Sequence, residues 1–508
     1  MSELPSGWAD VTLSDVLISV VGGGTPSRNV PAFFKGSIPW FTVKDMKSLR
    51  PLDAEEHISE LALANSATNL IPANTLIVAT RIALGRAMRP TVACAINQDL
   101  KALFFGSGVS ADFLLYWVGA SERIIKDLGS GTTVSGIRLD ALNGLPLKLP
   151  PAAEQSRIVA KLEELLFDLD AGVVELKAAQ RKLAQYRQSL LKAAVEGSLT
   201  AEWRKQNAPA ETGAQLLERI LAERRARWEA QQLAKFEAQG KKPPKDWQRK
   251  YPEPVQADTT ALPELPEGWV WASVDQLSDF VRNGLSKTPN NDQKGFQILR
   301  INAVRPMSVN FGAIKHIEIR ESEAEDYWVE EGDVLATRYN GSVDLLGVFG
   351  MVRGVHERTL HPDKLVRMKP VTGGKLGAWM EVCGNVGFSR KHLVSRVKTT
   401  AGQTGISGSD LKKTPIPLAP AAEQDMTLTV LNERLEAVKE LEQPIEHSLN
   451  QSAAQRQNIL RAAFAGQLVP QDPNDEPASV LLERIRAERA AQAPARKPRG
   501  PKTRKAAA

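Results

Sequence analysis

Two Thr-Arg pairs are the side chains of this sequence best suited to hold an anionic partner. Thr80-Arg81 and Thr337-Arg338 each follow a short apolar run typical of a strand, and each precedes a loop that contains glycine. An arginine on a loop rim can hydrogen-bond a phosphate or a guanine edge, and a threonine hydroxyl can donate to a phosphate. An ion pair inside the same globule explains each arginine equally well. The pairs therefore predict a nucleic-acid contact that needs independent support.

Further basic residues extend this prediction. Lys44 and Arg300 lie near the ends of two other apolar runs. Between residues 353 and 413 there are twelve Lys and Arg against four Asp and Glu, and this stretch includes Arg390 and Lys391. Such an excess of cations can follow a phosphate backbone, although an ordinary solvated surface has the same composition.

The sequence lacks the motifs that common catalytic and metal sites require. Residues 22–26, Gly-Gly-Gly-Thr-Pro, lack the lysine of a phosphate-binding loop and are typical of a turn. His356 and His361 are a weak candidate pair for a metal, and Cys94 and Cys383 are better explained as buried apolar side chains. We expect no catalytic residue and no metal site in this chain.

The elements that would position the basic residues occur twice, in the same order. A globule rich in β-branched residues and glycine is followed by a Pro-Ala-Ala-Glu-Gln helix entry and a long helix, and then the series repeats. The matching segments are Leu4–Trp8 and Leu265–Trp269, Ala79–Arg81 and Ala336–Arg338, Pro146–Gln155 and Pro415–Gln424, Arg187–Ala194 and Arg456–Ala463, and Leu216–Ile220 and Leu481–Ile485. This order predicts a tandem duplication.

The apolar residues of each long helix have a helical period. Between Ile158 and Leu190 they alternate spacings of four and three, which is a heptad pattern, and a less regular series runs from Leu428 to Leu449. Packing against the helix's own globule is the simpler explanation of such a face. A helix of about 40 residues, however, is ~60 Å long and overhangs a small globule, which favours a partner helix.

These patterns predict an α+β fold with a pseudo-two-fold axis. We expect two mixed α/β domains separated by two long helices that form an antiparallel coiled coil. The predicted boundaries are residues 1–150 and 262–420 for the domains, 151–261 for the first helical region with its linker, 421–490 for the second helical region, and 491–508 for a basic disordered tail.

Charge and hydropathy bound the function further. The chain has 508 residues and a formal net charge of +6. The tail carries six Lys and Arg and no acid, so the remainder of the chain is neutral. No apolar run is long enough to span a bilayer, and the start of the sequence is unlike a signal peptide. We expect a cytoplasmic protein with no membrane association.

The repeated Leu-Pro-x-Gly-Trp openings, the Pro-Ala-Ala-Glu-Gln entries and the Arg-Gln-x-Leu/Ile-Leu helix ends resemble the specificity subunit of type I restriction-modification enzymes. The resemblance covers roughly residues 4–490. It implies that the globules are target recognition domains, that each reads one half of a split, asymmetric sequence in double-stranded DNA, and that the helices set the gap between the halves.

The resemblance also implies partners. Two methyltransferase subunits, which bind S-adenosylmethionine and methylate adenine, are expected to dock on the helices, and a motor-nuclease subunit uses ATP and Mg to translocate and cut DNA. This chain itself is expected to bind no cofactor. We place the docking surface at the repeated helix ends, on Arg187, Leu190, Leu191, Arg456, Ile459 and Leu460.

Three other interpretations stay open on the sequence alone. One is a catalytically silent coiled-coil adaptor with two protein-binding heads, and another is a free-standing DNA-binding regulator. The third is the specificity subunit of a complex that methylates DNA but does not cut it.

Overall fold

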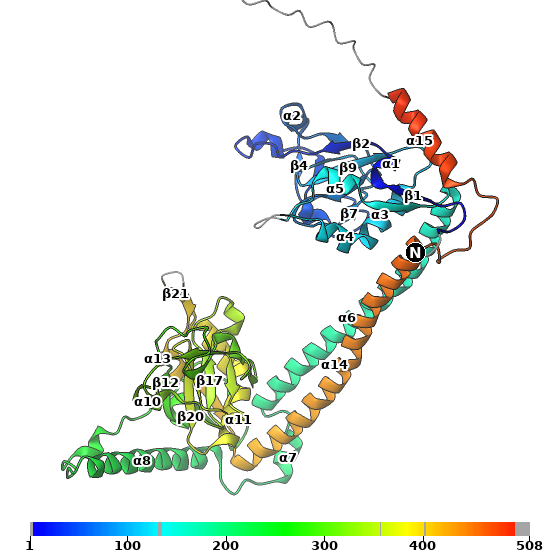
Figure 1. Cartoon of the computed structure of the whole chain (residues 1–508). Coiled ribbons are helices and arrows are strands. Elements are labelled where there is room, and N and C mark those ends of the chain that lie inside the picture. The colour runs from blue at the N-terminus through cyan, green and yellow to red at the C-terminus, as the bar shows by residue number, and fades with distance from the viewer. Residues whose placement is uncertain (1–3, 131–134, 356, 401–402, 493–508) are drawn as a thin grey trace, which may run out of the picture. The chain divides into compact units, whose positions relative to one another are not determined.

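The computed structural model describes residues 4–130, 135–355, 357–400 and 403–492. The chain divides into two compact units (Figure 1), residues 1–177 with 446–508 (unit 1) and residues 178–445 (unit 2). Each unit contains a mixed α/β globule, head 1 or head 2, together with parts of two long helices. Most of the predicted tail, residues 493–508, lies outside the described residues.

Head 1 is built on two small sheets. The first has the strand order β2-β9-β6-β7 and the second has the order β4-β3-β8-β5, while β1 pairs with β10. The strands are β1 (Ala9–Thr12), β2 (Leu17–Gly22), β3 (Ile38–Phe41), β4 (His57–Ile58), β5 (Leu70–Ile71), β6 (Leu76–Ala79), β7 (Ala87–Met88), β8 (Cys94–Ile96), β9 (Leu100–Phe105) and β10 (Pro146–Leu149). The helices are α1 (Leu13–Val16), α2 (Glu60–Ala64), α3 (Ala111–Ala120), α4 (Glu122–Asp127) and α5 (Leu139–Asn143).

Head 2 has a corresponding arrangement. Its first sheet has the order β12-β20-β17-β18, its second has the order β16-β13-β19, and β11 pairs with β23. The strands are β11 (Val270–Ser273), β12 (Ser278–Asn283), β13 (Phe296–Leu299), β14 (Val304–Arg305), β15 (Ser308–Val309), β16 (Ile314–Ile317), β17 (Val334–Thr337), β18 (Phe349–Met351), β19 (Thr359–Leu360), β20 (Leu365–Pro370), β21 (Lys398–Thr400), β22 (Gln403–Gly405) and β23 (Pro415–Leu418). The helices are α9 (Val274–Leu277), α10 (Glu321–Ala324), α11 (Gly374–Asn385), α12 (Gly387–Ser395) and α13 (Gly408–Lys412).

The strands that lead into the Thr-Arg pairs, β6 and β17, lie in the centre of the first sheet of each head. All four residues of β6 and of β17 are buried, as expected for apolar, β-branched runs with a strand on both sides. The predicted mixed α/β character of both globules is confirmed.

The predicted long helices are also confirmed. Helix α6 (Ala152–Val195) and helix α14 (Ala421–Phe464) each have 44 residues. Each is followed by a glycine in the left-handed region, Gly197 or Gly466, both with a φ of 71°. Glycine adopts this conformation without the steric cost of a Cβ atom, so it ends each helix. A Cβ on Gly197 would also lie 3.1 Å from the ring of Trp269.

In unit 1 the beginning of α6 and the end of α14 share one apolar core with head 1. Leu162 and Leu166 of α6 are buried in this core together with Leu460 of α14. Asp170 of α6 pairs with Arg456 of α14. The predicted heptad seam is only partly buried, because Gly172 is exposed and a Cβ there would have no neighbour within 4 Å.

In unit 2 the end of α6 and the beginning of α14 share a core with head 2. Leu190 and Leu191 of α6 are buried there with Leu431 and Val438 of α14. At the start of α14 the buried carboxylate of Glu423 accepts hydrogen bonds from several donors, including the indole of Trp269 at 2.8 Å.

Each head is completed by a helix from the segment that follows a long helix. Helix α7 (Ala201–Gln206) and helix α8 (Gly213–Ala238) follow α6, whereas α15 (Ala478–Gln492) follows α14. The start of α8 packs in unit 2 against head 2, and α15 packs in unit 1 beside α1 and β2 of head 1 (Figure 1). The repeated segments Leu216–Ile220 and Leu481–Ile485 thus both lie in helices.

The two closing helices use an arginine in the same way. The guanidinium of Arg489 donates to the carbonyl oxygen of Leu17 at 2.6 Å, and that of Arg224 donates to the carbonyl oxygen of Ser278 at 2.9 Å. Leu17 and Ser278 are the residues that directly follow the short helices α1 and α9. Each arginine therefore satisfies a carbonyl group that a helix C-terminus leaves without an intrahelical partner.

Candidate nucleic-acid interface

In head 1 the hydroxyl of Thr80 is used by the fold, while the guanidinium of Arg81 is partly exposed. Thr80 is buried, and its hydroxyl donates to the carbonyl oxygen of Asp99 at 3.1 Å. Arg81 lies 3.2 Å from the carboxylate of Asp99, with half of its side chain exposed. Of the two residues, only Arg81 presents a polar group to a partner.

In head 2 the same division holds. Thr337 is fully buried, and its hydroxyl donates to the carbonyl oxygen of Leu345. The guanidinium carbon of Arg338 lies 4.9 Å from the ring centre of Tyr339, and its Nε atom is buried without a hydrogen-bond partner among the described residues. The prediction that the two threonines contact DNA stays untested, but both hydroxyls already have backbone partners.

The two Thr-Arg pairs do not occupy the same position in their sheets. In head 1 Ala79 pairs with Leu100, the first residue of β9, whereas in head 2 Thr337 pairs with Leu365, the first residue of β20. The sheets therefore align Thr80 with Arg338 and Arg81 with Tyr339. Matching the two segments by their letters is wrong by one residue.

The alignment by the sheets also matches Asp99 with Lys364. The carbonyl oxygen of Asp99 accepts the backbone N–H of Thr80 at 2.8 Å, and that of Lys364 accepts the N–H of Arg338 at 2.8 Å. Head 1 thus carries an acid at a position where head 2 carries a base.

A hollow of about 280 Å³ lies beside this position in head 1. Four acids line it, against two bases. The charged residues are Arg28, Lys44, Asp45, Glu55, Glu56 and Asp99. Lys44, predicted from sequence as a weak candidate, lies here and is exposed, but the acids around it give the hollow an excess of negative charge.

Ile82 lines the same hollow and has an unusual conformation. Its φ is 67°, which is rare for a β-branched residue, and 60% of its surface is exposed. Left-handed strain in an exposed apolar residue is a feature that functional sites often contain. No signal in the sequence could have identified this residue.

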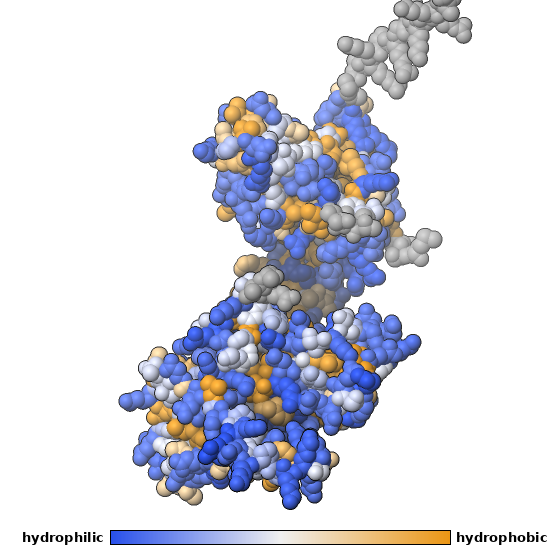
Figure 2. Space-filling view, turned by 90° about the vertical axis from the view of Figure 1, so that its left-hand side faces the viewer, coloured by the Kyte–Doolittle hydropathy of each residue, from blue (hydrophilic) through white to orange (hydrophobic). Residues whose placement is uncertain are grey.

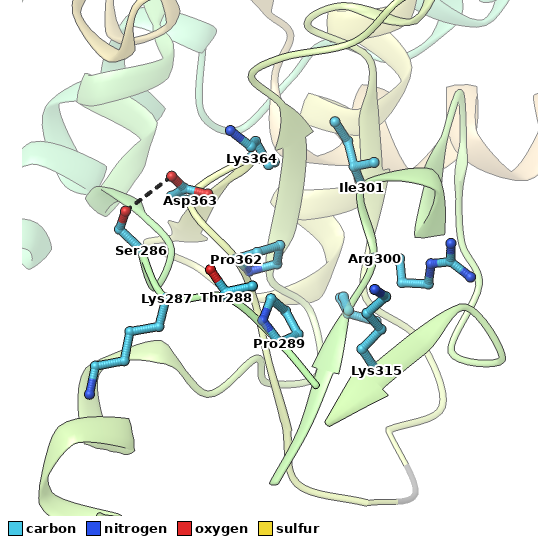
Figure 3. A pocket seen from close by; sticks show the side chains of 11 residues that line it. Ser286, Lys287, Thr288, Pro289, Arg300, Ile301, Lys315, Pro362, Asp363 and Lys364 are labelled. Carbon is cyan, nitrogen blue, oxygen red and sulfur yellow. Dashed lines mark hydrogen bonds between the residues drawn. The ribbon is translucent and has the colours of Figure 1, made fainter. Parts of the chain in front are cut away.

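A larger hollow of about 460 Å³ lies at the corresponding place in head 2 (Figure 3). Arg300, a predicted residue, lines it together with Lys315 and Lys364, which sequence reasoning missed. The hydroxyl of Ser286 donates to the carboxylate of Asp363 at 3.2 Å within the hollow (Figure 3). We call this site the basic hollow; Lys287 also lines it.

A buried histidine lies next to the wall of the basic hollow. Burial lowers the pKa of His361 to about 4, so the imidazole is neutral at pH 7. Its Nδ1 atom lies 2.7 Å from the carbonyl oxygen of Tyr327 and therefore donates to it, whereas Nε2 has no partner among the described residues. The hollow thus gains no positive charge from this residue.

Arg390 and Lys391 lie apart from the basic hollow. Arg390 is partly buried, and its guanidinium donates to the carbonyl oxygens of Asp344 and Leu346. Burial lowers the pKa of Arg390. The ammonium of Lys391 lies 5.0 Å from the ring centre of Phe388. Both residues line a separate pocket next to the end of α6.

The residues predicted to bind a partner divide by exposure. Leu190, Leu191, Ile459 and Leu460 are buried in the cores of their own units. Arg187 is exposed. Arg456 is partly exposed and pairs with Asp170. The docking prediction stays untested, but the buried leucines and isoleucine already have structural roles.

The remaining candidates for chemistry have structural surroundings. Cys94 and Cys383 are free and buried, and burial raises the pKa of Cys94 to about 12. Among the described residues, no group of three His, Cys, Asp or Glu is arranged to hold a metal ion. His356, of the predicted pair, lies outside that part of the chain. No helix in the described ranges is long and apolar enough to cross a membrane.

The surface in Figure 2 is mainly hydrophilic, with apolar residues in separate small groups. Such a surface suits a polar partner better than an apolar one.

Comparison with known proteins identifies relatives along most of the chain. The family model described as the type I restriction modification DNA specificity domain matches residues 5–180. The EcoKI specificity subunit of Escherichia coli (strain K12) is 28% identical over 409 residues, which cover 78% of this chain and 75% of that protein. The StySPI specificity subunit of Salmonella potsdam is 23% identical over 407 residues, which cover 78% and 76%.

A solved structure supports the fold over a greater length. A chain from a study of assembly and conformational transition of the type I R-M system matches with a TM-score of 0.57 and 15% identity, over 92% of this chain and 100% of that one. The repeated motifs, the two heads with their long helices, and these relatives agree. In sequence the chain is similar, along most of its length, to the specificity subunits of type I restriction-modification enzymes.

Proposed function

We propose that this chain recognises a bipartite, asymmetric DNA sequence for a type I restriction-modification complex, with one half-site read by each head. The observation that carries this proposal is the similarity to curated specificity subunits over three quarters of both chains. The first sheets of the two heads have corresponding strand orders, yet the hollows of the heads differ in charge, which favours two different half-sites. The chain itself is non-catalytic, because catalysis in this family belongs to other subunits.

The chain as a whole is, in this proposal, a tandem repeat whose long helices form an antiparallel coiled coil. Two observations support this arrangement. In unit 1 the beginning of α6 shares a core with the end of α14, and in unit 2 the end of α6 shares a core with the beginning of α14. Antiparallel helices produce this pattern of partners.

The partners are two methyltransferase subunits, which bind S-adenosylmethionine and modify adenine, and motor-nuclease subunits, which use ATP and Mg. The complex acts on double-stranded DNA in the cytoplasm. These roles extend from the family to this chain.

We place methyltransferase docking on the exposed side of α6 in unit 1. Phe167 is 75% exposed and Val174 is 59% exposed, and their spacing of seven residues places them on one helix face. Exposed apolar side chains grouped on a helix face are typical of contact sites. In unit 2, the exposed predicted residue Arg187 of α6 is a separate docking candidate.

Copurification tests the docking surface. Changing Phe167→Ser should reduce capture of the methyltransferase by the tagged chain. The matched control is Leu52→Ser, because Leu52 is 74% exposed and lies in head 1. Equal capture by both variants would place the docking surface elsewhere.

A genome-wide map of methylated adenines, with and without the gene, tests the main proposal. We expect one split, asymmetric motif with a fixed gap to lose methylation when the gene is removed. Removing the gene should also reduce restriction of incoming unmethylated DNA. If the wild-type strain shows no restriction, the chain belongs to a complex that methylates DNA but does not cut it. An unchanged map, together with no copurifying methyltransferase, would favour an adaptor.

A further inference from the structure

The basic hollow of head 2 contains positive charge that the protein does not neutralise. Arg300, Lys315 and Lys364 form no ion pair with any residue in the described ranges. Lys287 differs, because its ammonium pairs with Glu323. The carboxylate of Asp363 is the acid on the wall of the hollow, so three unpaired cations face one acid.

These three cations come from separate elements of head 2. Arg300 follows β13, Lys315 lies in β16, and Lys364 precedes β20. In Figure 3, Arg300 and Lys315 lie on one side of the hollow, with Ser286 and Asp363 on the other. Like charges brought together by rigid strands repel one another, and an anionic or electronegative ligand would relieve this repulsion.

Lys364 also connects the hollow with the predicted arginine. Its ammonium lies 4.9 Å from the ring centre of Tyr339. The guanidinium carbon of Arg338 also lies 4.9 Å from the centre of this ring. Arg338 lines an adjoining pocket that contains Arg396 and Lys398 as well. The basic surface therefore continues from Arg300, through Lys364, to the end of β17.

Head 1 supplies an internal comparison. Where head 2 has Lys364 beside Tyr339, head 1 has Asp99 beside Arg81, at 3.2 Å. The hollow of head 1 carries more acids than bases, and its Arg28 pairs with Glu56 at 2.8 Å. The same place in the fold is thus basic in one head and acidic in the other.

We propose that Arg300 and Lys364 in the basic hollow bind acceptor oxygen or nitrogen atoms of DNA, and that this position distinguishes the half-site of head 2 from that of head 1. The inference rests on the proposed function, because it takes DNA as the partner. Two sources offer this chemistry: the phosphate oxygens of the backbone, and the O6 and N7 atoms of guanine in the major groove.

The test uses the assembled complex and variants that each remove one positive charge. Arg300→Gln and Lys364→Gln change the hollow. The control is Lys375→Gln, because Lys375 lies on α11 of head 2 with 79% of its side chain exposed and already pairs with Asp425. Binding is measured over a series of salt concentrations, on a duplex with the methylated motif and on one with both half-sites scrambled. Thermal unfolding confirms that each variant folds.

We expect Arg300→Gln and Lys364→Gln to weaken binding to the target about 5- to 150-fold, with Lys375→Gln close to wild type. If the contact is a phosphate, affinity falls on both duplexes and the salt slope decreases by about one. If the contact is guanine, the loss is confined to the target, and discrimination is relaxed at one base pair of the head 2 half-site.

Binding by both hollow variants that equals the control would overturn the inference while leaving the proposed function intact. The proposed function fails separately if the wild-type complex does not prefer its motif over the scrambled duplex. Relaxed discrimination at a base pair of the head 1 half-site would also contradict the assignment of the basic hollow to the head 2 half-site.

Discussion

Head 1 takes part of its core from α15, and this dependence can be measured. Ile485 of α15 is fully buried, and a Cβ added to Gly106 of head 1 would lie 2.5 Å from its Cγ1 atom. Changing Ile485→Ala removes buried methyl and methylene groups and leaves a cavity at this contact. We expect the free energy of unfolding of head 1 to fall by about 3 kcal/mol, within the ~2–5 kcal/mol range for such truncations.

Arg489→Ala should cause a smaller loss of stability in head 1. The change leaves the carbonyl oxygens of Ser14 and Leu17 without their guanidinium donor. Unmet carbonyl groups in buried surroundings cost ~1–3 kcal/mol, and the lower end applies here because Arg489 is only partly buried. The double variant should therefore lose about 4 kcal/mol from head 1.

Hydrogen exchange measured by mass spectrometry can assign this loss to one head. Peptides that contain β9 report on head 1, and peptides that contain β20 report on head 2. A loss of 3 kcal/mol corresponds to roughly 100-fold faster exchange of β9, with β20 unchanged. The matched control is Ile220→Ala, because Ile220 of α8 is also fully buried and lies in the core of unit 2.

The control should give the opposite pattern: the exchange of β20 becomes faster, and the exchange rate of β9 does not change. Unchanged protection of β9 in Ile485→Ala would refute the role of α15 in head 1. Equal losses in both heads would show that the two units do not unfold separately.

Three further predictions concern single residues. Because burial depresses the pKa of His361 to about 4, its contribution to stability is complete above pH 6.5 and is lost as the pH falls from 6.5 to 4; the loss is about 3 kcal/mol. Thermal unfolding of His361→Asn should show a weaker acid dependence over this window, and an identical pH profile would contradict the assignment. Gly23→Ala should destabilise head 1 by about 1–3 kcal/mol, because its Cβ would lie 2.0 Å from the carbonyl oxygen of Ile96. Gly119→Ala, where a Cβ meets nothing within 4 Å in α3, should instead stabilise by ~0.5 kcal/mol, and chemical denaturation that ranked the two glycine variants the other way would be evidence against this geometry. Trp269→Phe should cost about 1–2 kcal/mol in unit 2, measured by denaturation, because the carboxylate of Glu423 loses an indole donor at 2.8 Å; a neutral result would show that its other donors suffice.

The long helices and the class of each head were predictable because their signals are local. The Pro-Ala-Ala-Glu-Gln entries, the apolar period and the closing glycines all lie within one segment of sequence. Local chemistry specifies such elements without reference to the rest of the chain.

The binding site was less predictable because its partners are distant in sequence. The hydroxyl of Thr337 finds the carbonyl oxygen of Leu345 across a loop, which no motif indicates. Lys364 looks ordinary in sequence, and its importance comes from strands that bring it near Arg300. Pairing register also displaced two identical Ala-Thr-Arg strings by one residue, an effect that only the neighbouring strand reveals.

The amphipathic helix ends show a related ambiguity. Leu190 and Ile459 lie in repeated, apolar segments, which could equally face a separate protein or the chain's own core. The structure places both in their own cores. An apolar helix face indicates that it is buried, but its sequence does not indicate whether another protein or the chain's own core covers it.

The closing contact of α15 has a consequence for biosynthesis. Unit 2 is one continuous stretch, residues 178–445, whereas unit 1 combines the two ends of the chain. On the ribosome, head 1 emerges first but must wait for α15, and the ~330 residues between Leu149 and Ala478 take roughly 15 to 65 s at 5–20 residues per second. During that interval the groove that receives Ile485 is open, so the first head synthesised is the last to be completed. Nascent chains stalled before α15 should therefore expose head 1 to proteases and chaperones while head 2 is already protected.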